Sequence, residues 1–244
     1  MNSKTLHIGS RELCLRQALV MGILNVTPDS FYAPSRVTKD EVVERAGKML
    51  DDGASILDIG GCSTRPGFVA PSVEEEWDRV APALDALRSA FPESVLSLDT
   101  FRAEIARRAL NEFGGLIIND VTGGDMEMYQ VVREFKVPYV LTGKRPTSDM
   151  SGVEIILDPG IGFLGSTEAD FEALRTMKKE ELPLLVGVSR KSLIWKTLGC
   201  TSNEALAPTQ ALHMYALMHG ADILRVHDVK EAAETIELFL RINH

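Results

Sequence analysis

The sequence has few cysteines, few aromatic residues and no excess of positive charge. Only three cysteines, Cys14, Cys62 and Cys200, occur among 244 residues, and they are widely separated, without the spacing of metal ligands. An odd number of scattered cysteines favours reduced thiols over a disulfide framework or a zinc site. The formal net charge of −9 does not provide the basic face that a nucleic acid or an anionic membrane requires. We therefore expect neither of these partners.

Long hydrophobic runs are also lacking. No apolar run approaches the roughly 18 residues of a membrane span, and Met1 to Gln17 mixes charges with scattered apolar residues. We therefore expect a cytoplasmic protein. The glycines of the Gly60–Gly67 stretch have the wrong spacing for a dinucleotide fingerprint. With 45% hydrophobic residues the chain is long enough for one large core, so we predict a single domain over residues 1–244.

A regular alternation of short apolar runs and helical patterns fills the chain. In the first helical pattern, Asp40–Asp52, apolar residues such as Val42, Ala46 and Met49 recur at helical spacing. Eight such alternations predict a (β/α)8 TIM barrel in preference to a doubly wound sheet. The expected strands are Ala18–Val26, Ser55–Ile59, Val95–Leu98, Leu116–Ile118, Pro138–Leu141, Glu154–Leu157, Leu182–Val188 and Asp222–Val226.

Capping patterns predict where several helices start. Ser72 and Glu75 form a capping-box pattern, and Thr167 with Asp170 resembles another. Pro208 is a favourable first-turn residue, so we expect the helix after the seventh strand to begin there.

The helix after the fifth strand is predicted to be missing. Thr142–Val153 is rich in glycine, proline, serine and aspartate, which favours an extended crossover. Twelve extended residues reach up to about 40 Å, whereas a return along one strand needs about 17 to 20 Å. The outer layer should therefore have a gap, with part of the fifth and sixth strands either exposed or covered by a partner subunit or a neighbouring helix.

Polar and charged residues gather at the predicted C-terminal strand ends, where barrels of this kind carry their chemistry. Arg225 and His227 occupy alternate positions, so both can project the same way, and with Asn25 on the neighbouring strand they would suit a phosphate or diphosphate. The carboxylates of Asp99 and Asp158 and the carboxamide of Asn119 would suit a flat heterocycle that has both hydrogen-bond donors and acceptors. The whole set is Asn25, Thr64, Arg65, Asp99, Asn119, Asp158, Phe163, Lys191, Ser192, Arg225 and His227.

Each residue of this set also has a simpler structural interpretation. Asp99 could cap the next helix. Arg225 could pair with Asp222 or Asp228, and His227 could be a hydrogen-bonded core residue. The Ser-Arg-Lys-Ser run that contains Lys191 could be a solvated loop. The concentration of the whole set on one rim favours the functional interpretation.

Seven motifs together resemble those of dihydropteroate synthase: MGILNVTPDSF, GGCSTRPG, LSLDT, IINDV, ILDPGIGF, LLVGVSRKS and ILRVHDVKE. The resemblance runs from about Met21 to the C-terminus, in order and at the right strand ends. It implies a (β/α)8 barrel that condenses 6-hydroxymethyl-7,8-dihydropterin diphosphate with 4-aminobenzoate, giving 7,8-dihydropteroate and diphosphate for folate biosynthesis. It also implies Mg2+, a homodimer and a target of sulfonamides.

The resemblance also assigns roles to the rim residues. Its implied pterin-binding residues are Asp99, Asn119, Asp158 and Lys191. The implied diphosphate-binding residues are Asn25, Arg225 and His227, with Asn25 also a metal ligand. The implied aminobenzoate-binding residues are Thr64, Arg65, Pro66, Phe163 and Ser192. The residues implied in catalysis are Asn25, Arg65, Lys191, Arg225 and His227.

The chain departs from the family pattern at four places. Tyr32–Ser35 replaces an Asp- and Gly-rich turn, and Cys62 stands where many relatives have Glu. Thr142–Lys144 replaces Met-His-Met, and the following helix is absent. A pterin-binding paralogue with weak or no synthase activity therefore remains an alternative. A folate-dependent methyl-transfer barrel is a third reading, but it gains nothing from Arg65, Arg225 and His227.

Overall fold

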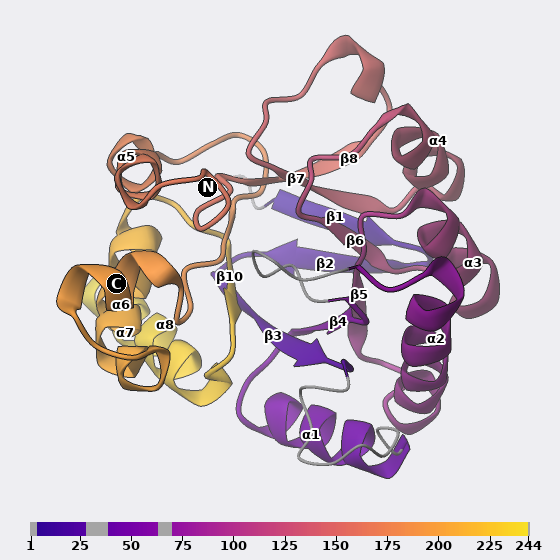
Figure 1. Ribbon diagram of the computed structural model, residues 1–244, viewed down its shortest axis with the longest axis horizontal. Coiled ribbons are helices and arrows are strands. Elements are labelled where there is room, and N and C mark those ends of the chain that lie inside the picture. Colours follow the sequence, from indigo (N-terminus) through magenta and orange to yellow (C-terminus); the bar gives the residue numbers. More distant parts are fainter. Residues whose placement is uncertain (1–3, 28–38, 63–69, 244) are drawn as a thin grey trace.

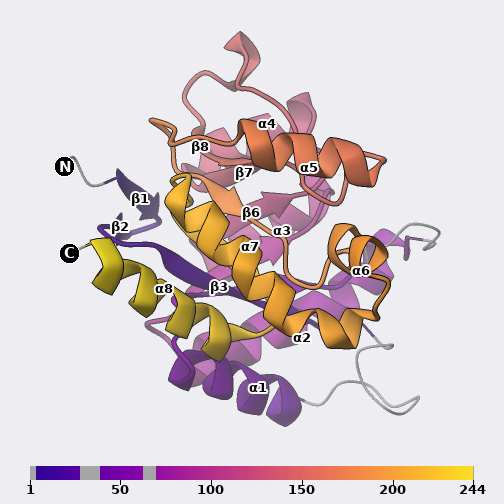
Figure 2. The same ribbon diagram turned by 90° about the vertical axis from the view of Figure 1, so that its left-hand side faces the viewer.

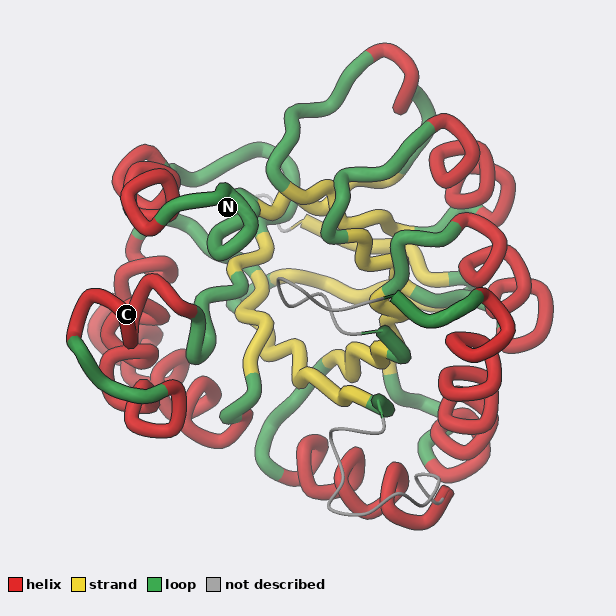
Figure 3. The backbone as a smooth tube through the Cα atoms, in the orientation of Figure 1, coloured by secondary structure: helices red, strands yellow, loops and turns green. Residues whose placement is uncertain are grey.

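The computed structural model describes residues 4–27, 39–62 and 70–243. Its centre is a ring of parallel strands enclosed by helices (Figures 1 and 3). The strands of this ring are β3 (Leu19–Asn25), β4 (Ile56–Gly60), β5 (Val95–Asp99), β6 (Ile117–Asp120), β7 (Pro138–Thr142), β8 (Glu154–Asp158), β9 (Leu185–Val186) and β10 (Ile223–Val226). The helices are α1 (Lys39–Asp51), α2 (Val73–Ala90), α3 (Ala103–Phe113), α4 (Met126–Phe135), α5 (Thr167–Thr176), α6 (Ser192–Leu198), α7 (Leu206–Met218) and α8 (Val229–Asn243).

The strands follow the order β8-β7-β6-β5-β4-β3-β10-β9, and every neighbouring pair is parallel. The two ends of this order meet through a parallel bridge between Leu157 and Leu184, so the ring is nearly closed. The predicted (β/α)8 barrel is confirmed. All C-terminal strand ends therefore meet at one mouth.

Side chains that alternate along each strand divide the interior of the barrel into two halves. Met21, Ile56, Ile117 and Ile223 belong to one buried apolar cluster at the N-terminal half. Two residues further along β4, β6 and β10, the inward positions are the polar residues Asp58, Asn119 and Arg225. The core thus fills one end of the lumen and leaves polar groups for the other.

A β-hairpin seals the apolar end of the barrel. Strands β1 (Lys4–Ile8) and β2 (Arg11–Leu15) pair antiparallel, and Leu6, Ile8 and Leu15 join the apolar cluster inside the barrel. The sequence analysis treated this stretch as a polar lead and missed it. The alternation of apolar Leu6 and Ile8 with exposed His7 was the available signal.

The crossover from β7 to β8, which is described in full, contains only a short 3-10 helix, η2 (Ser148–Met150). The predicted absence of the fifth helix is confirmed. However, Leu141, Ile155 and Leu157 of these strands are buried. The side chain of Met150 is buried with them, and Arg133 of α4 donates to the Ser151 carbonyl at 2.9 Å. The crossover itself therefore covers the strands, and the expectation of an exposed or partner-covered surface here is wrong.

Three local predictions need correction around α5 to α7. Ser166, not Thr167, caps α5, because its side chain accepts from the backbone N–H of Ala169 at 3.1 Å. The seventh strand is reduced to Leu185–Val186, since Gly187 and the residues that follow turn toward the mouth. An unpredicted helix, α6, comes next, and α7 begins at Leu206, two residues before Pro208.

Two further predictions concern the thiols and the second helix. Cys14, Cys62 and Cys200 form no disulfide, as predicted. The capping box of Ser72 and Glu75 at the start of α2 is also confirmed. In the described part of the chain, no helix is both long and apolar enough to cross a membrane.

The hairpin seal predicts a large stability effect at Leu6. Leu6 of this hairpin is fully buried in the apolar cluster inside the barrel. The variant Leu6→Ala should lose about 2–5 kcal/mol of the free energy of unfolding, because it leaves a cavity at the barrel bottom. Urea unfolding followed by circular dichroism measures this change. Glu12→Ala on the exposed side of the same hairpin should change it by less than about 0.5 kcal/mol. Equal effects of the two variants would contradict the sealing role.

Candidate active site

Five of the predicted rim residues meet at the C-terminal mouth of the barrel. Asp99 and Asn119 end neighbouring strands and are Cα partners in the sheet. Asp158 ends β8, Arg225 lies on β10, and Lys191 precedes α6. Their contacts and burial link them into one polar cluster.

Arg225 is the centre of this cluster. Its Nε donates to Asp58 at 2.6 Å, and its Nη2 donates to Asp99 at 2.5 Å. The interpretation that Arg225 pairs with Asp222 or Asp228 is therefore wrong. Its guanidinium instead bridges two carboxylates from β4 and β5 inside the barrel, a geometry that a planar, forked donor suits.

Asp58 is the site residue that the sequence analysis missed. Its side chain is fully buried and accepts from Ser97 at 2.6 Å, from Asn119 at 3.0 Å and from Arg225. The signal was a charged residue in the middle of an otherwise apolar strand, two positions after the inward-facing Ile56. In a strand, such positions share one face.

Of the two carboxylates that contact Arg225, Asp99 is the less well stabilised in its charged form. The prediction that it might cap the next helix is wrong, since Arg102 occupies the N-cap of α3. The pKa of Asp99 is raised to about 7, mainly by burial and further by the negative charge of Asp58, while the positive charge of Arg225 opposes the rise. One guanidinium cannot neutralise two carboxylates, so an extra negative charge lies close to Arg225.

Lys191 and Asp158 form the second charged pair of the mouth. The pKa of Lys191 is lowered to about 8, mainly by burial and further by the positive charge of Arg225, while Asp158 opposes the shift. Burial also raises the pKa of Asp158, and Lys191 opposes that change. The Asp158 carboxylate accepts from the backbone N–H of Gly160 at 2.7 Å, which fixes its orientation.

The Asp-Pro-Gly-Ile-Gly-Phe segment shapes the path of Lys191. The Lys191 ammonium donates to the Ile161 carbonyl and lies 4.5 Å from the centre of the Phe163 ring. A Cβ at Gly162 would stand 2.6 Å from the Lys191 Cδ, and Gly162 has a φ of +89°. Only glycine fits this backbone beside the lysine stem.

Arg190 holds the loop that presents Lys191. It has a φ of +53°, unusual for a residue with a side chain, and donates to Asp228 through Nε at 2.7 Å and Nη2 at 2.9 Å. Its Nη1 donates to the carbonyls of Ser202 and Asn203. The interpretation of this run as a solvated loop is wrong for Arg190, whose contacts anchor the loop to α8 and to η3 (Ser202–Ala205).

Asn25 and His227 lie at the ends of adjacent strands on the same rim. The Asn25 Oδ1 and the Asp99 Oδ2 lie 3.5 and 3.6 Å from the point where a Cβ on Gly60 would stand, so Gly60 separates them. His227 is exposed, which contradicts a core role, and its backbone N–H donates to Ser189 at 3.1 Å.

The structure describes only two of the five residues that are predicted to bind aminobenzoate, and their role stays a prediction. Phe163 is exposed beside Lys191, and Ser192 is the first residue of α6 next to it. Thr64, Arg65 and Pro66 lie outside the described part of the chain, within residues 63–69. The altered turn Tyr32–Ser35 is also outside it, within residues 28–38.

The departure at the end of β7 places a hydroxyl beside the cluster. Thr142 is buried, pairs with Asp158 in the sheet, and follows the inward-facing Val140 by two positions. Its Oγ1 is enclosed without a hydrogen-bond partner among the described residues. Lys144, the third residue of the altered run, donates to the Gly123 carbonyl at 3.2 Å and so straps the loop after β6.

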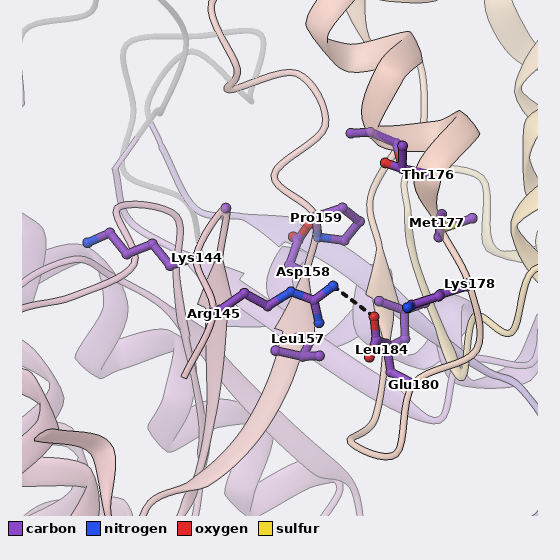
Figure 4. A pocket seen from close by; sticks show the side chains of 12 residues that line it. Lys144, Arg145, Leu157, Asp158, Pro159, Thr176, Met177, Lys178, Glu180 and Leu184 are labelled. Carbon is purple, nitrogen blue, oxygen red and sulfur yellow. Dashed lines mark hydrogen bonds and ion pairs between the residues drawn. The ribbon is translucent and has the colours of Figure 1, made fainter. Parts of the chain in front are cut away.

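A separate cavity of about 250 Å³ opens on the outer wall of the barrel beside α5. Figure 4 shows Arg145 crossing it toward Glu180, with an ion pair at 2.9 Å, while the Lys144 side chain points away. Leu157 and Leu184 line its floor. Gly143, Asp158 and Pro159, at the C-terminal ends of β7 and β8, also line the cavity.

Comparison with known proteins identifies the class to which this barrel and its charged mouth belong. The family described as pterin binding enzyme matches residues 21–154 and 147–227. The match spans the strand ends that carry the cluster, from β3 to β10.

Relatives with known names narrow this class. Dihydropteroate synthase of Clostridium beijerinckii is 37% identical over 96% of this chain and 99% of its own, and that of Bacillus subtilis is 37% identical over 91% and 87%. The structure of Xanthomonas albilineans dihydropteroate synthase with 4-aminobenzoic acid matches with a TM-score of 0.89, 32% identity and 99% coverage of both chains. The chain belongs to the dihydropteroate synthase family.

The anchoring role of Arg190 predicts a loss of stability on its conservative replacement. Arg190→Lys removes the forked contact with Asp228, so the free energy of unfolding should fall by about 1–3 kcal/mol. Arg175→Lys, at an arginine whose two ion pairs are on the exposed face of α5, is the matched control and should cost less than about 0.5 kcal/mol. Thermal and urea unfolding of both variants provide the measurement. Similar losses would show that the Arg190 contacts do not anchor the loop.

Proposed function

We infer that this protein is a transferase that condenses 6-hydroxymethyl-7,8-dihydropterin diphosphate with 4-aminobenzoate, releasing 7,8-dihydropteroate and diphosphate. The observation that carries this inference is the meeting of Asp99, Asn119, Asp158 and Lys191 around Arg225 at one mouth. The resemblance assigns four of these residues to the pterin. Relatives that carry the name of this enzyme over almost the whole chain support it.

The polar cluster suits the edge of a pterin ring. The Asp158 carboxylate is an acceptor for the ring's amino group and adjacent N–H. Asn119 offers one acceptor, its Oδ1, because its Nδ2 is used by Asp58. Lys191 supplies a cationic donor, and burial strengthens all these contacts because little water competes with them. The ring would therefore bind in a fixed orientation.

The opposite side of the rim suits the diphosphate. Asn25, Arg225 and His227 lie on adjacent strands β3 and β10. Two of the three Arg225 nitrogens are engaged with carboxylates, which leaves Nη1 for a phosphate oxygen. Donors placed at the oxygens on which charge grows stabilise the leaving group.

The donor set at this rim also suits a magnesium ion. The described residues include no group of three His, Cys, Asp or Glu side chains that could hold a metal by themselves. Mg2+ commonly takes one or two protein oxygens together with phosphates and water, and the Asn25 Oδ1 is such an oxygen. Bound there with the substrate, the ion would neutralise charge on the diphosphate.

The reaction needs no protein nucleophile. The amine nitrogen of aminobenzoate forms a bond to the exocyclic carbon of the pterin, while the bond from that carbon to the diphosphate oxygen breaks. Diphosphate leaves with the bonding electrons, and the amine loses a proton. Thr64, Arg65 and Pro66 with Phe163 and Ser192 would bind the aminobenzoate and exclude water from the reacting carbon.

Sulfonamides resemble aminobenzoate in shape and charge, so we propose that they compete for the same pocket. A structure of the Yersinia pestis enzyme with a sulfonamide drug complex, 31% identical over 98% of this chain, supports this proposal.

A turnover assay tests the proposed reaction. Incubation with the pterin diphosphate, 4-aminobenzoate and Mg2+ should yield 7,8-dihydropteroate. Asp158→Asn should reduce kcat/KM for the pterin substrate by on the order of 10²-fold. The reason is that the NH2 group of the new amide is a donor and would face the N–H donors of the pterin ring. Product formation by chromatography gives the rates. A protein that binds the pterin in calorimetry yet forms no product would favour the binding-only paralogue.

The lowered pKa of Lys191 predicts an alkaline limit to pterin use. Lys191 is charged below its pKa of about 8 and loses its proton as the pH rises through that value. Burial is the main cause of the lowered pKa, and Arg225 also lowers it, while the carboxylates of Asp158, Asp170 and Asp99 raise it. The neutral amine that remains is a weaker donor to the pterin ring and has no charge. Therefore kcat/KM for the pterin substrate should fall above about pH 8.

The arginine variant isolates the contribution of Lys191. Lys191→Arg keeps the charge but does not titrate in this range, so its lower activity should no longer fall near pH 8. An unchanged alkaline limb in this variant would assign the limb to another group.

We propose that the protein forms a homodimer through α7 and α8. These helices pack side by side on one flank of the barrel (Figure 2). Met218, Leu238 and Ile242 are 69%, 60% and 74% exposed there, and Leu238 and Ile242 share one face of α8. Large apolar residues gathered on one flank favour a protein partner.

Sedimentation velocity tests the dimer. The wild-type protein should sediment as a dimer, and Leu238→Glu should shift it toward a monomer by placing a charge in the interface. Glu112→Lys on the exposed side of α3, away from these two helices, is the control and should leave the dimer intact. A monomeric wild-type protein would contradict this proposal.

A further inference from the structure

Asp58 lies below the rim and receives hydrogen bonds from three other strands. Ser97 of β5 donates at 2.6 Å, Asn119 of β6 at 3.0 Å and Arg225 of β10 at 2.6 Å. The Asp58 side chain has no exposed surface, whereas Arg225 retains 14%. Asp58 is therefore beyond the reach of substrate, yet it contacts two residues that the proposed function places against substrate.

The contact with Asn119 determines which end of that amide faces the mouth. A carboxylate accepts and cannot donate, so it selects the Nδ2 of Asn119 as its partner. The Oδ1 of Asn119 must then point away from Asp58. With a partner that also donates, the amide could turn over and present its NH2 to the ligand.

The contact with Arg225 fixes that side chain in the same way. Nε bonds to Asp58 while Nη2 bonds to Asp99, so the guanidinium plane is held at two edges. Loss of the Nε contact would leave Arg225 attached to Asp99 alone and free to rotate about it. Rotation would displace the remaining nitrogen from a bound phosphate.

We propose that Asp58 is a positioning residue of the pterin site, which orients the Asn119 amide and the Arg225 guanidinium through its three hydrogen bonds. This inference rests on the proposed function, because it assigns Asp58 a role in binding the pterin diphosphate. Ser97 supports Asp58 from the neighbouring strand. The sequence analysis gave neither residue a role, although Ser97 lies in the LSLDT motif.

The negative charge of Asp58 adds a second effect, on Asp99. The charged groups that face Asp99 are Arg225 from β10, Asp58 from β4, Asp120 from β6 and Glu76 from α2. Burial is the largest cause of the raised pKa of Asp99, and Asp58 raises it further. Replacing Asp58 by a neutral residue removes that repulsion, and the charge of Arg225 then stabilises only the Asp99 carboxylate of the two. The pKa of Asp99 must therefore fall.

Asp58→Asn tests the proposal through substrate-specific kinetics. The KM for the pterin diphosphate should rise 10- to 100-fold, while the KM for 4-aminobenzoate changes less than twofold. In the wild-type protein, kcat/KM for the pterin substrate should fall as the pH drops through about 7, where Asp99 takes up a proton. In Asp58→Asn this acid limb should move to lower pH, a change that a merely loosened structure would not produce.

Ser97 gives a milder variant if Asp58→Asn does not fold. Ser97→Ala removes one donor and retains the charge of Asp58, so the pterin KM should rise 3- to 10-fold without a shift of the acid limb toward lower pH. Ser97→Thr keeps the hydroxyl and should restore the wild-type KM. Asp222→Asn is the matched control, since Asp222 pairs with Lys4 at 2.6 Å near the sealed end of the barrel. It should leave both KM values unchanged.

The outcomes separate this inference from the proposed function. A folded Asp58→Asn protein with a wild-type pterin KM and an unmoved acid limb would overturn the positioning role alone. Equal pterin KM values for Ser97→Ala and the wild-type protein would overturn it too. A wild-type protein that forms no dihydropteroate would instead contradict the proposed function.

Discussion

The buried guanidinium of Arg225 is the constraint on which the rest of the site depends. A cation inside a barrel is tolerated only with carboxylates close by, and Asp58 and Asp99 supply them at 2.6 and 2.5 Å. Two carboxylates around one cation leave the cluster with excess negative charge, which Asp58 bears with three donors and Asp99 with fewer. The same cluster then determines the direction of the Asn119 amide. The chemistry of the mouth thus follows from how one buried arginine is neutralised.

The fold makes this arrangement possible by separating apolar from polar side chains along the same strands. Ile56 and Asp58 lie two residues apart on the same face of β4, yet one belongs to the sealed apolar end and the other to the polar end. The β1–β2 hairpin excludes water from the apolar end. No α-helix is needed between β7 and β8 because the site is built from strand ends, and the crossover covers those strands by itself.

Much of the architecture could be predicted because its signals are local. Alternating apolar runs located the strands, and polar residues directly after them located Asp99, Asn119 and Asp158. The N-terminal hairpin was missed because its strands carry only three inward apolar residues between charged ones, too few to stand out from a polar lead. Helix α6 was missed because it has only seven residues and begins with Ser192, the last residue of the Ser-Arg-Lys-Ser run, which is typical of a loop.

The partners of charged residues could not be predicted, because they depend on which strands become neighbours in the closed ring. Arg225 is 167 residues from Asp58 in the chain, so neither its pairing nor the role of Asp58 has a local signal. Asp228 was an apparent partner for Arg225 because it is close in sequence. In the structure Asp228 instead accepts from Arg190, a residue with a left-handed backbone.

The geometry of the mouth also explains why two of its residues titrate away from their usual ranges. Asp99 and Lys191 are buried around the same guanidinium, which is repulsive to the lysine and only partly neutralises the aspartate. A ligand with both donors and acceptors along one edge can satisfy such a pair at once, as a pterin ring does. Under the proposed function, the binding specificity and the electrostatic state of the site thus have the same origin.

A crystal structure of this protein with 7,8-dihydropteroate would test the account most directly. The account predicts that the pterin ring lies at the C-terminal mouth, with its edge against Asp158 and Asn119 and with Lys191 in contact. A pterin ring bound elsewhere, such as in the outer cavity crossed by Arg145 and Glu180, would contradict it.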